Sequence, residues 1–121
     1  MINPQTFLIV VDNSGASKLQ CIRILSNSKD FGLIGDTIIG VVKDALPGLI
    51  VSRSDIVRAV IVRTKQTYLR RDRSHVYFDD NASVIIDNKD TPVGTRIFGP
   101  IAREVKEKRF SKVSTLTSEL L

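Results

Sequence analysis

The chain has 121 residues, of which 42% are hydrophobic and 26% are charged, and its formal net charge is +5. This length supports one domain with a single core, and the composition is typical of a soluble globular protein. The one cysteine, Cys21, excludes an internal disulfide and fits a reducing compartment, and no apolar stretch reaches the ~20 residues needed to span a bilayer.

Short runs of apolar, β-branched residues recur along the chain, separated by turn residues, and each run predicts a strand. The first run ends in Asp12-Asn13-Ser14-Gly15, a strong turn cluster, and the third is broken by 45–48, which contains Pro47 and Gly48. Strands at this spacing predict a small closed or sandwiched β structure. The predicted strands are 7–11, 19–25, 37–43, 56–62 and 82–87, with a short piece at 76–78.

The last quarter of the chain changes its apolar spacing from that of a strand to that of a helix. Ile101, Val105 and Phe110 have helical spacing, and charged residues fill the other face. Pro100 suits the first helical turn, where its missing N–H costs little. A second short piece, helical or extended, is expected from 113 to 121. Since no linker or repeat is visible, 1–121 is predicted to be a single domain, with β structure over about 1–100 and a helical segment over about 101–121.

Positive charge is concentrated in residues 63–78, where five basic residues stand against one acid (+4), while 1–62 carry +1 and 79–121 carry 0. A basic loop between two buried strands is what a protein presents to a phosphate backbone. Tyr68 and Tyr77 add a stacking surface. The alternatives are a solvated hairpin whose charges only aid solubility, and a membrane surface, for which this window is too polar. The five cations are Arg63, Lys65, Arg70, Arg71 and Arg73.

Residues suited to catalysis or metal binding are scarce. His75 is the only histidine, and Cys21 lies in an apolar strand, where we expect a buried, inert thiol. Asp79 and Asp80 are adjacent, so on a strand they would point to opposite faces; we expect a turn or pairing with nearby arginines. The chain has no Gly-rich phosphate loop and no dinucleotide fingerprint. We therefore predict a protein that is not an enzyme, with no cofactor and no metal.

Residues 92–100 form an unusual stretch that precedes the predicted helix. Two glycines and two prolines fix its backbone while presenting Thr95, Arg96 and Phe98. The stretch is either a rigid turn entering the helix or a contact surface, because rigid loops with an exposed arginine commonly serve as one.

Several separate motifs of the chain are distinctive, and they lie in 12–16 (DNSGA), 21–22 (CI), 59–64 (AVIVRT), 78–85 (FDDNA leading into VI) and 94–104 (GTRIFGP, then ARE). Together they resemble the universal large-subunit ribosomal protein fourteen family over nearly the whole chain. The resemblance implies a mainly β fold, a small five-stranded β-barrel with a protruding β-ribbon and short C-terminal helices. It also implies a structural constituent of the large ribosomal subunit that binds large-subunit rRNA directly.

The resemblance further implies that the protein lies at the subunit interface and contacts small-subunit rRNA in a bridge. It also implies contacts with neighbouring large-subunit proteins. The rRNA-binding residues would be the five ribbon cations and, on the C-terminal helix, Arg103, Lys106, Lys108 and Arg109, although the acids beside these four leave a solvated face open. A ribosome-silencing factor docks on the interface patch of the family. Here that patch would comprise Thr95, Arg96, Phe98 and Lys112.

The sequence departs from the family at two places. The family has glycine after the aspartate of the ribbon turn, whereas Arg73 follows Asp72 here; a non-glycine at positive φ would be strained, which leaves the turn geometry open. A Lys-rich stretch of bacterial members is replaced by 48–54, with one basic residue, so we expect weaker or different RNA contacts there.

Residues 54–59 and 79–82 resemble plastid members more than bacterial ones. We therefore expect a plastid-encoded copy on ribosomes of the stroma, with the bacterial cytoplasm as the alternative. The N-terminus has neither a secretory layout nor the character of a transit peptide, so the protein is expected to work where it is made, unless a targeting segment has been removed.

The rival function is a free-standing small barrel that binds single-stranded nucleic acid. Such domains interleave several exposed aromatic residues with their basic ones. Only Tyr68 and Tyr77 lie near the basic window, which favours the ribosomal interpretation.

Overall fold

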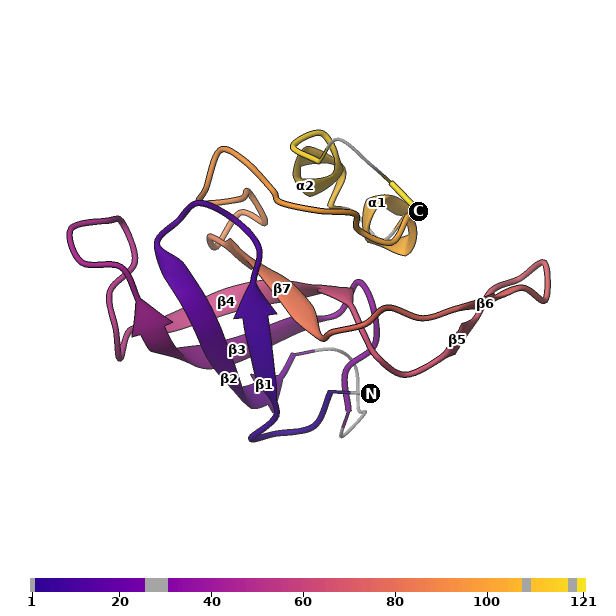
Figure 1. Cartoon of the computed structure of the whole chain (residues 1–121), viewed down its shortest axis with the longest axis horizontal. Helices are drawn as coiled ribbons and strands as arrows, with labels where there is room; N and C mark the ends of the chain where they lie inside the picture. Colours follow the sequence, from indigo (N-terminus) through magenta and orange to yellow (C-terminus); the bar gives the residue numbers. More distant parts are fainter. Residues whose placement is uncertain (1, 26–30, 108–109, 118–119) are drawn as a thin grey trace.

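A closed five-stranded barrel forms the body of the molecule (Figure 1). The computed structural model describes residues 2–25, 31–107, 110–117 and 120–121. The last strand closes the barrel because it pairs with the fourth strand in antiparallel fashion and with the first in parallel fashion. The predicted five-stranded β-barrel is thus confirmed. In barrel order the strands are β1 (Phe7–Val10), β2 (Ala16–Ile24), β3 (Thr37–Ala45), β4 (Ile56–Arg63) and β7 (Ala82–Ile86).

A two-stranded ribbon leaves the barrel between β4 and β7. Its strands β5 (Tyr68–Leu69) and β6 (His75–Val76) pair only with each other, and Figure 1 shows the ribbon projecting to the right, away from the barrel. The loop between β3 and β4 projects from the opposite end. The protruding ribbon is therefore confirmed, with a second strand shorter than the predicted 76–78.

Two short helices, α1 (Glu104–Glu107) and α2 (Ser111–Ser114), lie over one side of the barrel (Figure 1). The expectation of short C-terminal helices is confirmed, but the predicted helix start near Pro100 is wrong. Ile101 lies in an isolated bridge with Leu120, and the Ala102 N–H donates to the Val62 carbonyl at 3.2 Å. The chain is therefore held against β4 here and turns into a helix only after 103.

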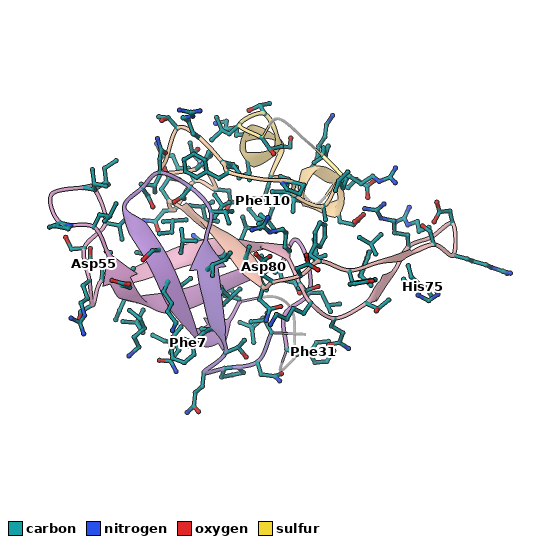
Figure 2. All side chains as sticks on the ribbon, viewed as in Figure 1. Phe7, Phe31, Asp55, His75, Asp80 and Phe110 are labelled. Carbon is teal, nitrogen blue, oxygen red and sulfur yellow. The ribbon has the colours of Figure 1, made fainter. Side chains whose placement is uncertain are left out.

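The core consists of two apolar clusters that share the walls of the barrel. Ala59 and Ile61 of β4 belong to the cluster inside the barrel, whereas Val60 and Val62 belong to the cluster between the barrel and the C-terminal segment. Since alternate side chains of a strand point to opposite faces, a strand that is covered on both faces must be apolar throughout. Phe110, which is 1% exposed, fills the outer cluster beneath the helices (Figure 2).

Candidate nucleic-acid interface

The five cations of the basic window separate into two groups by exposure. The side chains of Arg63 and Arg70 are each only 12% exposed, and each forms an ion pair with a carboxylate of this chain. Lys65, Arg71 and Arg73 are exposed on the ribbon. The window thus contains three cations that face solvent and two whose charge is balanced inside the protein.

Arg70 ties the ribbon to helix α1. Its Nε donates to both carboxylate oxygens of Glu104, at 3.2 and 3.1 Å, and its Nη2 donates to Oε1 at 3.1 Å and to the main-chain oxygen of Leu121. The Glu104 side chain is 7% exposed, so the pair is largely removed from water. Charge-assisted, forked contacts of this kind fix geometry as well as charge.

Arg63 forms the corresponding tie at the base of the ribbon. Its Nε lies 3.0 Å from Oδ1 of Asp80, and its Nη2 donates to Oδ2 at 3.3 Å. Figure 2 shows Asp80 where the returning strand rejoins the barrel. A Cβ on Gly99, whose φ is +85°, would lie 2.9 Å from Nη1 of Arg63. The pairing of Asp80 with a nearby arginine, expected from the sequence, is confirmed.

Main-chain contacts also hold the base of the ribbon. The Lys65 N–H donates to Oδ1 of Asn81 at 2.9 Å, and the Phe78 N–H donates to the Thr64 carbonyl at 2.9 Å. These bonds join the two arms where they leave the barrel. The exposed cations are therefore carried on a ribbon that is fixed at its base and along its side.

The ribbon turn keeps a left-handed residue even though that residue is not glycine. Arg73 has a φ of 70°, its N–H donates to the Arg70 carbonyl at 3.0 Å, and the Arg70 N–H donates to the Ser74 carbonyl at 2.9 Å. This is a tight turn followed by a left-handed position, where glycine is favoured. Hydrogen bonds from the side chain and main chain of Ser74 hold the pKa of Asp72 below its usual value.

Replacing Arg73 by glycine should therefore tighten the turn. The left-handed conformation costs a non-glycine residue about 1 kcal/mol, so the Arg70 amide should exchange about fivefold more slowly in Arg73→Gly than in Arg73→Ala, which removes the same charge and keeps the strain. Amide hydrogen exchange measures this difference. Equal exchange in the two variants would show that the turn stores no strain.

The second candidate patch is held in place by the side chain of Asn13. Its Oδ1 accepts the N–H groups of Thr95 and Arg96, at 2.7 and 3.2 Å, and its Nδ2 donates to Oγ1 of Thr95 at 2.8 Å. A Cβ on Gly94 would lie 2.6 Å from the same Oδ1, so the loop needs glycine there to approach so closely. Thr95, Arg96 and Phe98 are all exposed.

Asp12 anchors this arrangement to the barrel. Its carboxylate accepts the main-chain and hydroxyl hydrogens of Ser14 and, at 3.0 Å, the N–H of Ile85 in β7. Burial raises the pKa of Asp12, against the lowering effect of these hydrogen bonds. Sequence reasoning identified 12–15 as a turn and as part of a family motif, but gave its side chains no structural role. The contacts that tie these side chains to Thr95 and Ile85 span more than seventy residues, and no local pattern indicates them.

Replacing Asn13 by alanine should loosen the 94–98 loop. Three hydrogen bonds are lost, each worth about 0.5–1.5 kcal/mol, and because the site is partly open to water we expect a loss of about 1–2 kcal/mol in the free energy of unfolding. Urea denaturation measures the loss, and hydrogen exchange at the Thr95 amide locates it. Asn13→Asp retains the acceptor and is the control. An alanine variant as stable as the aspartate variant would contradict this role.

Three of the five remaining C-terminal candidates lie within the described residues. Arg103, Lys106 and Lys112 are exposed, whereas Lys108 and Arg109 lie outside the described residues. Main-chain hydrogen bonds from Thr91 and Lys89 lower the pKa of Asp87, and the charge of Lys112 adds to this effect, which places Lys112 towards the end of β7. Within the patch, the Arg96 guanidinium lies 5.8 Å from the centroid of the Phe98 ring.

The loop between β3 and β4 carries exposed aliphatic side chains. Leu46 and Ile50 are 64% and 71% exposed, Ile56 at the start of β4 is 71% exposed, and Arg53 is the basic residue of this loop. Figure 2 shows neighbouring Asp55 at the end of the molecule opposite to His75 of the ribbon. The two ends of the barrel therefore differ in chemistry, one being basic and the other apolar.

An exposed aromatic residue on β1 was missed by sequence reasoning. Phe7 is 48% exposed, and the Lys18 ammonium lies 4.6 Å from the centroid of its ring. A shallow hollow beside this ring is also lined by Lys65 and Asp80, so it adjoins the base of the ribbon. Phe7 stands in the apolar run of β1, and the sequence alone does not show which side chains of that run face solvent, because this depends on the strand register.

The structure places the single cysteine and the single histidine in contrasting surroundings. Cys21 is 1% exposed, as expected, and burial raises the pKa of its thiol. His75 is exposed on the ribbon. Within the described ranges, no three His, Cys, Asp or Glu residues come together as metal ligands. Among those same residues, no helix has both the length and the apolar character to cross a membrane.

A closed barrel with a clamped basic ribbon, and an exposed loop held by Asn13, places this chain among the small β-barrel proteins. A family model described as ribosomal protein L14p/L23e matches residues 1–121, and the chain belongs to this family. It is therefore a structural protein of the large ribosomal subunit, in a family that is not enzymatic. The resemblance seen in the motifs is confirmed, and the match favours the ribosomal interpretation over a free-standing nucleic-acid-binding barrel.

Proposed function

We propose that the chain binds large-subunit rRNA directly through the exposed cations of its ribbon. The observation that carries this proposal is the separation of the ribbon cations by exposure. Lys65, Arg71 and Arg73 reach phosphates, while Arg63 and Arg70 fix the direction of the ribbon. Because the ribbon is already ordered in the free protein, binding does not incur the entropic cost of ordering it.

Recognition rests on RNA shape and on the backbone, as is usual for folded RNA. Each phosphate that is neutralised releases counterions, so affinity depends strongly on salt. Arg103 and Lys106, together with Lys108 and Arg109, extend the contact beyond the ribbon. The acids of α1 keep this second area close to neutral, and it contributes less than the ribbon tip.

The exposed residues of the 94–98 loop form the second contact of the protein in this proposal. Thr95, Arg96 and Phe98, with Lys112, face the subunit interface, where they bridge to small-subunit rRNA and offer a docking face for a ribosome-silencing factor. The hydrogen bonds from Asn13 support this role, because they fix the loop in the free protein. Neighbouring large-subunit proteins cover other parts of the barrel.

The plastid ribosome is the proposed location of the protein. The support is the likeness of residues 54–59 and 79–82 to plastid members of the family. Bacterial ribosomes are the alternative. Immunodetection in ribosomes from isolated plastids distinguishes the two.

The salt dependence of RNA binding tests the proposed contact. If Lys65, Arg71, Arg73, Arg103 and Lys106 each meet a phosphate, log K against log[salt] should fall with a slope of about −3.5 to −4.5. This slope is measured by filter binding of the purified chain to large-subunit rRNA at salt concentrations from about 50 to about 200 mM. A slope near zero would contradict a phosphate clamp.

A further inference from the structure

A cleft separates the tip of the ribbon from helix α1. It has a volume of about 340 Å³ and is lined by Tyr68, Arg70, Arg71, Asp72, Arg103, Glu104 and Glu107. This is at the lower end of the ~300–1,000 Å³ range of small-ligand sites. The ribbon supplies one wall and the start of the C-terminal segment supplies the other, so the cleft exists because the ribbon is clamped to α1.

The groups that line the cleft differ in their remaining capacity to bind a ligand. Both carboxylate oxygens of Glu104 accept from Arg70, which makes this pair a neutral floor. The Asp72 carboxylate accepts from Ser74 within the turn. Glu107, in contrast, is exposed in the last position of α1. It is the carboxylate of the cleft best placed to accept hydrogen bonds from a ligand.

Tyr68 provides a fixed aromatic surface in this cleft. It is half-buried, packs against the outer core cluster, and pairs with Val76 across the ribbon. Arg71 and Arg103 are exposed at the rim, one on each wall. An aromatic ring with guanidinium groups beside it is the arrangement on which unstacked RNA bases lie.

The charge balance of the cleft excludes simpler ligands. Three arginines and three carboxylates line it, so a free anion would meet as many like charges as opposite ones. An apolar ligand would desolvate charged groups without compensation. A nucleotide matches the lining, because its phosphate can meet an arginine while the edge of its base donates to a carboxylate.

We propose that this cleft holds one unpaired nucleotide of RNA, with its base on Tyr68 and a preference for guanine. Guanine presents two parallel donors, N1–H and the 2-amino group, which match the two oxygens of the Glu107 carboxylate. Adenine and uracil lack this pair of donors. The base must be splayed out of a helix, since a stacked base cannot enter a recess between two protein segments. This inference rests on the proposed RNA-binding function and adds a base-specific contact to it.

Short RNA probes test the cleft directly. The probes are fluorescein-labelled uridine octamers that carry a single central G, A or C, and binding to the full chain is followed by fluorescence anisotropy at fixed salt. We expect the G probe to bind about tenfold more tightly than the A probe, the discrimination typical of one good bidentate base contact. Glu107→Gln should bring the ratio of the two affinities to about one, and Tyr68→Leu should weaken the G probe about tenfold.

Matched controls separate the cleft from the general charge of the protein. Tyr77→Leu removes the other ribbon tyrosine, which is 66% exposed and does not line the cleft, and Asp79→Asn removes an exposed carboxylate elsewhere. Neither should change the G-to-A ratio. If Tyr68→Leu fails to fold, Glu107→Gln, which changes an exposed residue, still tests the guanine preference through the G-to-A ratio.

Two outcomes would overturn the proposal in distinguishable ways. Equal affinity for all octamers, or a G preference that survives Glu107→Gln, would refute the guanine site. If the chain still bound large-subunit rRNA in a salt-dependent way, the proposed function would stand without that site. If the chain binds neither the octamers nor large-subunit rRNA, the cleft and the proposed function fail together.

Discussion

Replacing Glu104 by glutamine should lower the free energy of unfolding by about 3–5 kcal/mol, because it leaves the Arg70 guanidinium buried without its counter-charge. The side chains are 12% and 7% exposed, so water can compensate little of the loss. The pair also joins elements thirty-four residues apart, the ribbon and α1. Urea denaturation of the purified chain measures the change.

Two further variants test whether the buried charge is the cause. Glu107→Gln makes the same chemical change on the exposed side of α1 and should stay within about 0.5 kcal/mol of the native chain. A double variant, Arg70→Met with Glu104→Leu, removes both charges and should recover most of the stability. If Glu104→Gln costs no more than Glu107→Gln, the ion pair is not what holds the ribbon.

Reversing the three exposed ribbon cations should abolish stable binding to large-subunit rRNA. The variant Lys65→Glu, Arg71→Glu, Arg73→Glu loses three phosphate contacts and adds three repulsive charges, so we expect at least about a hundredfold loss of affinity near 100 mM salt. Arg63 and Arg70 are left intact because changing them would disturb their ion pairs. Filter binding gives the affinity, and incorporation into large subunits gives the consequence.

A charge-matched variant makes this result specific to the ribbon. Lys43→Glu, Arg53→Glu, Lys89→Glu changes the net charge equally at three exposed positions of the barrel and its loops. It should retain most of the affinity. An equal loss in the two triple variants would mean that net charge, and not the ribbon, governs binding.

The barrel could be predicted from the sequence because its strands are runs of β-branched residues between turn signals. The boundaries were harder: β2 begins at Ala16 rather than at 19, because two consecutive exposed polar residues, Ser17 and Lys18, and a register shift interrupt the apolar pattern at its start. The spacing of Ile101 and Val105 indicated a helix, but Ile101 is tied to Leu120 instead. Tertiary contacts there override a local period.

The location of the charged site followed from composition, but its internal organisation did not. The sequence shows that Arg63 and Arg70 are basic; it does not show that their partners are Asp80 and Glu104, seventeen and thirty-four residues away. Asn13, whose contacts lie eighty-two residues away, gave no local signal beyond a turn. Exposure and pairing are properties of the folded chain, so they decide which cations can reach a ligand.

Sedimentation through a sucrose gradient tests the central claim most directly. Lysate from the native compartment is fractionated with and without a high-salt wash, and the fractions are probed for this chain. The account predicts that the protein migrates with large subunits in the unwashed lysate, and that its retention falls as the salt of the wash is raised. A slowly sedimenting free pool with no protein on large subunits, even without the wash, would contradict it.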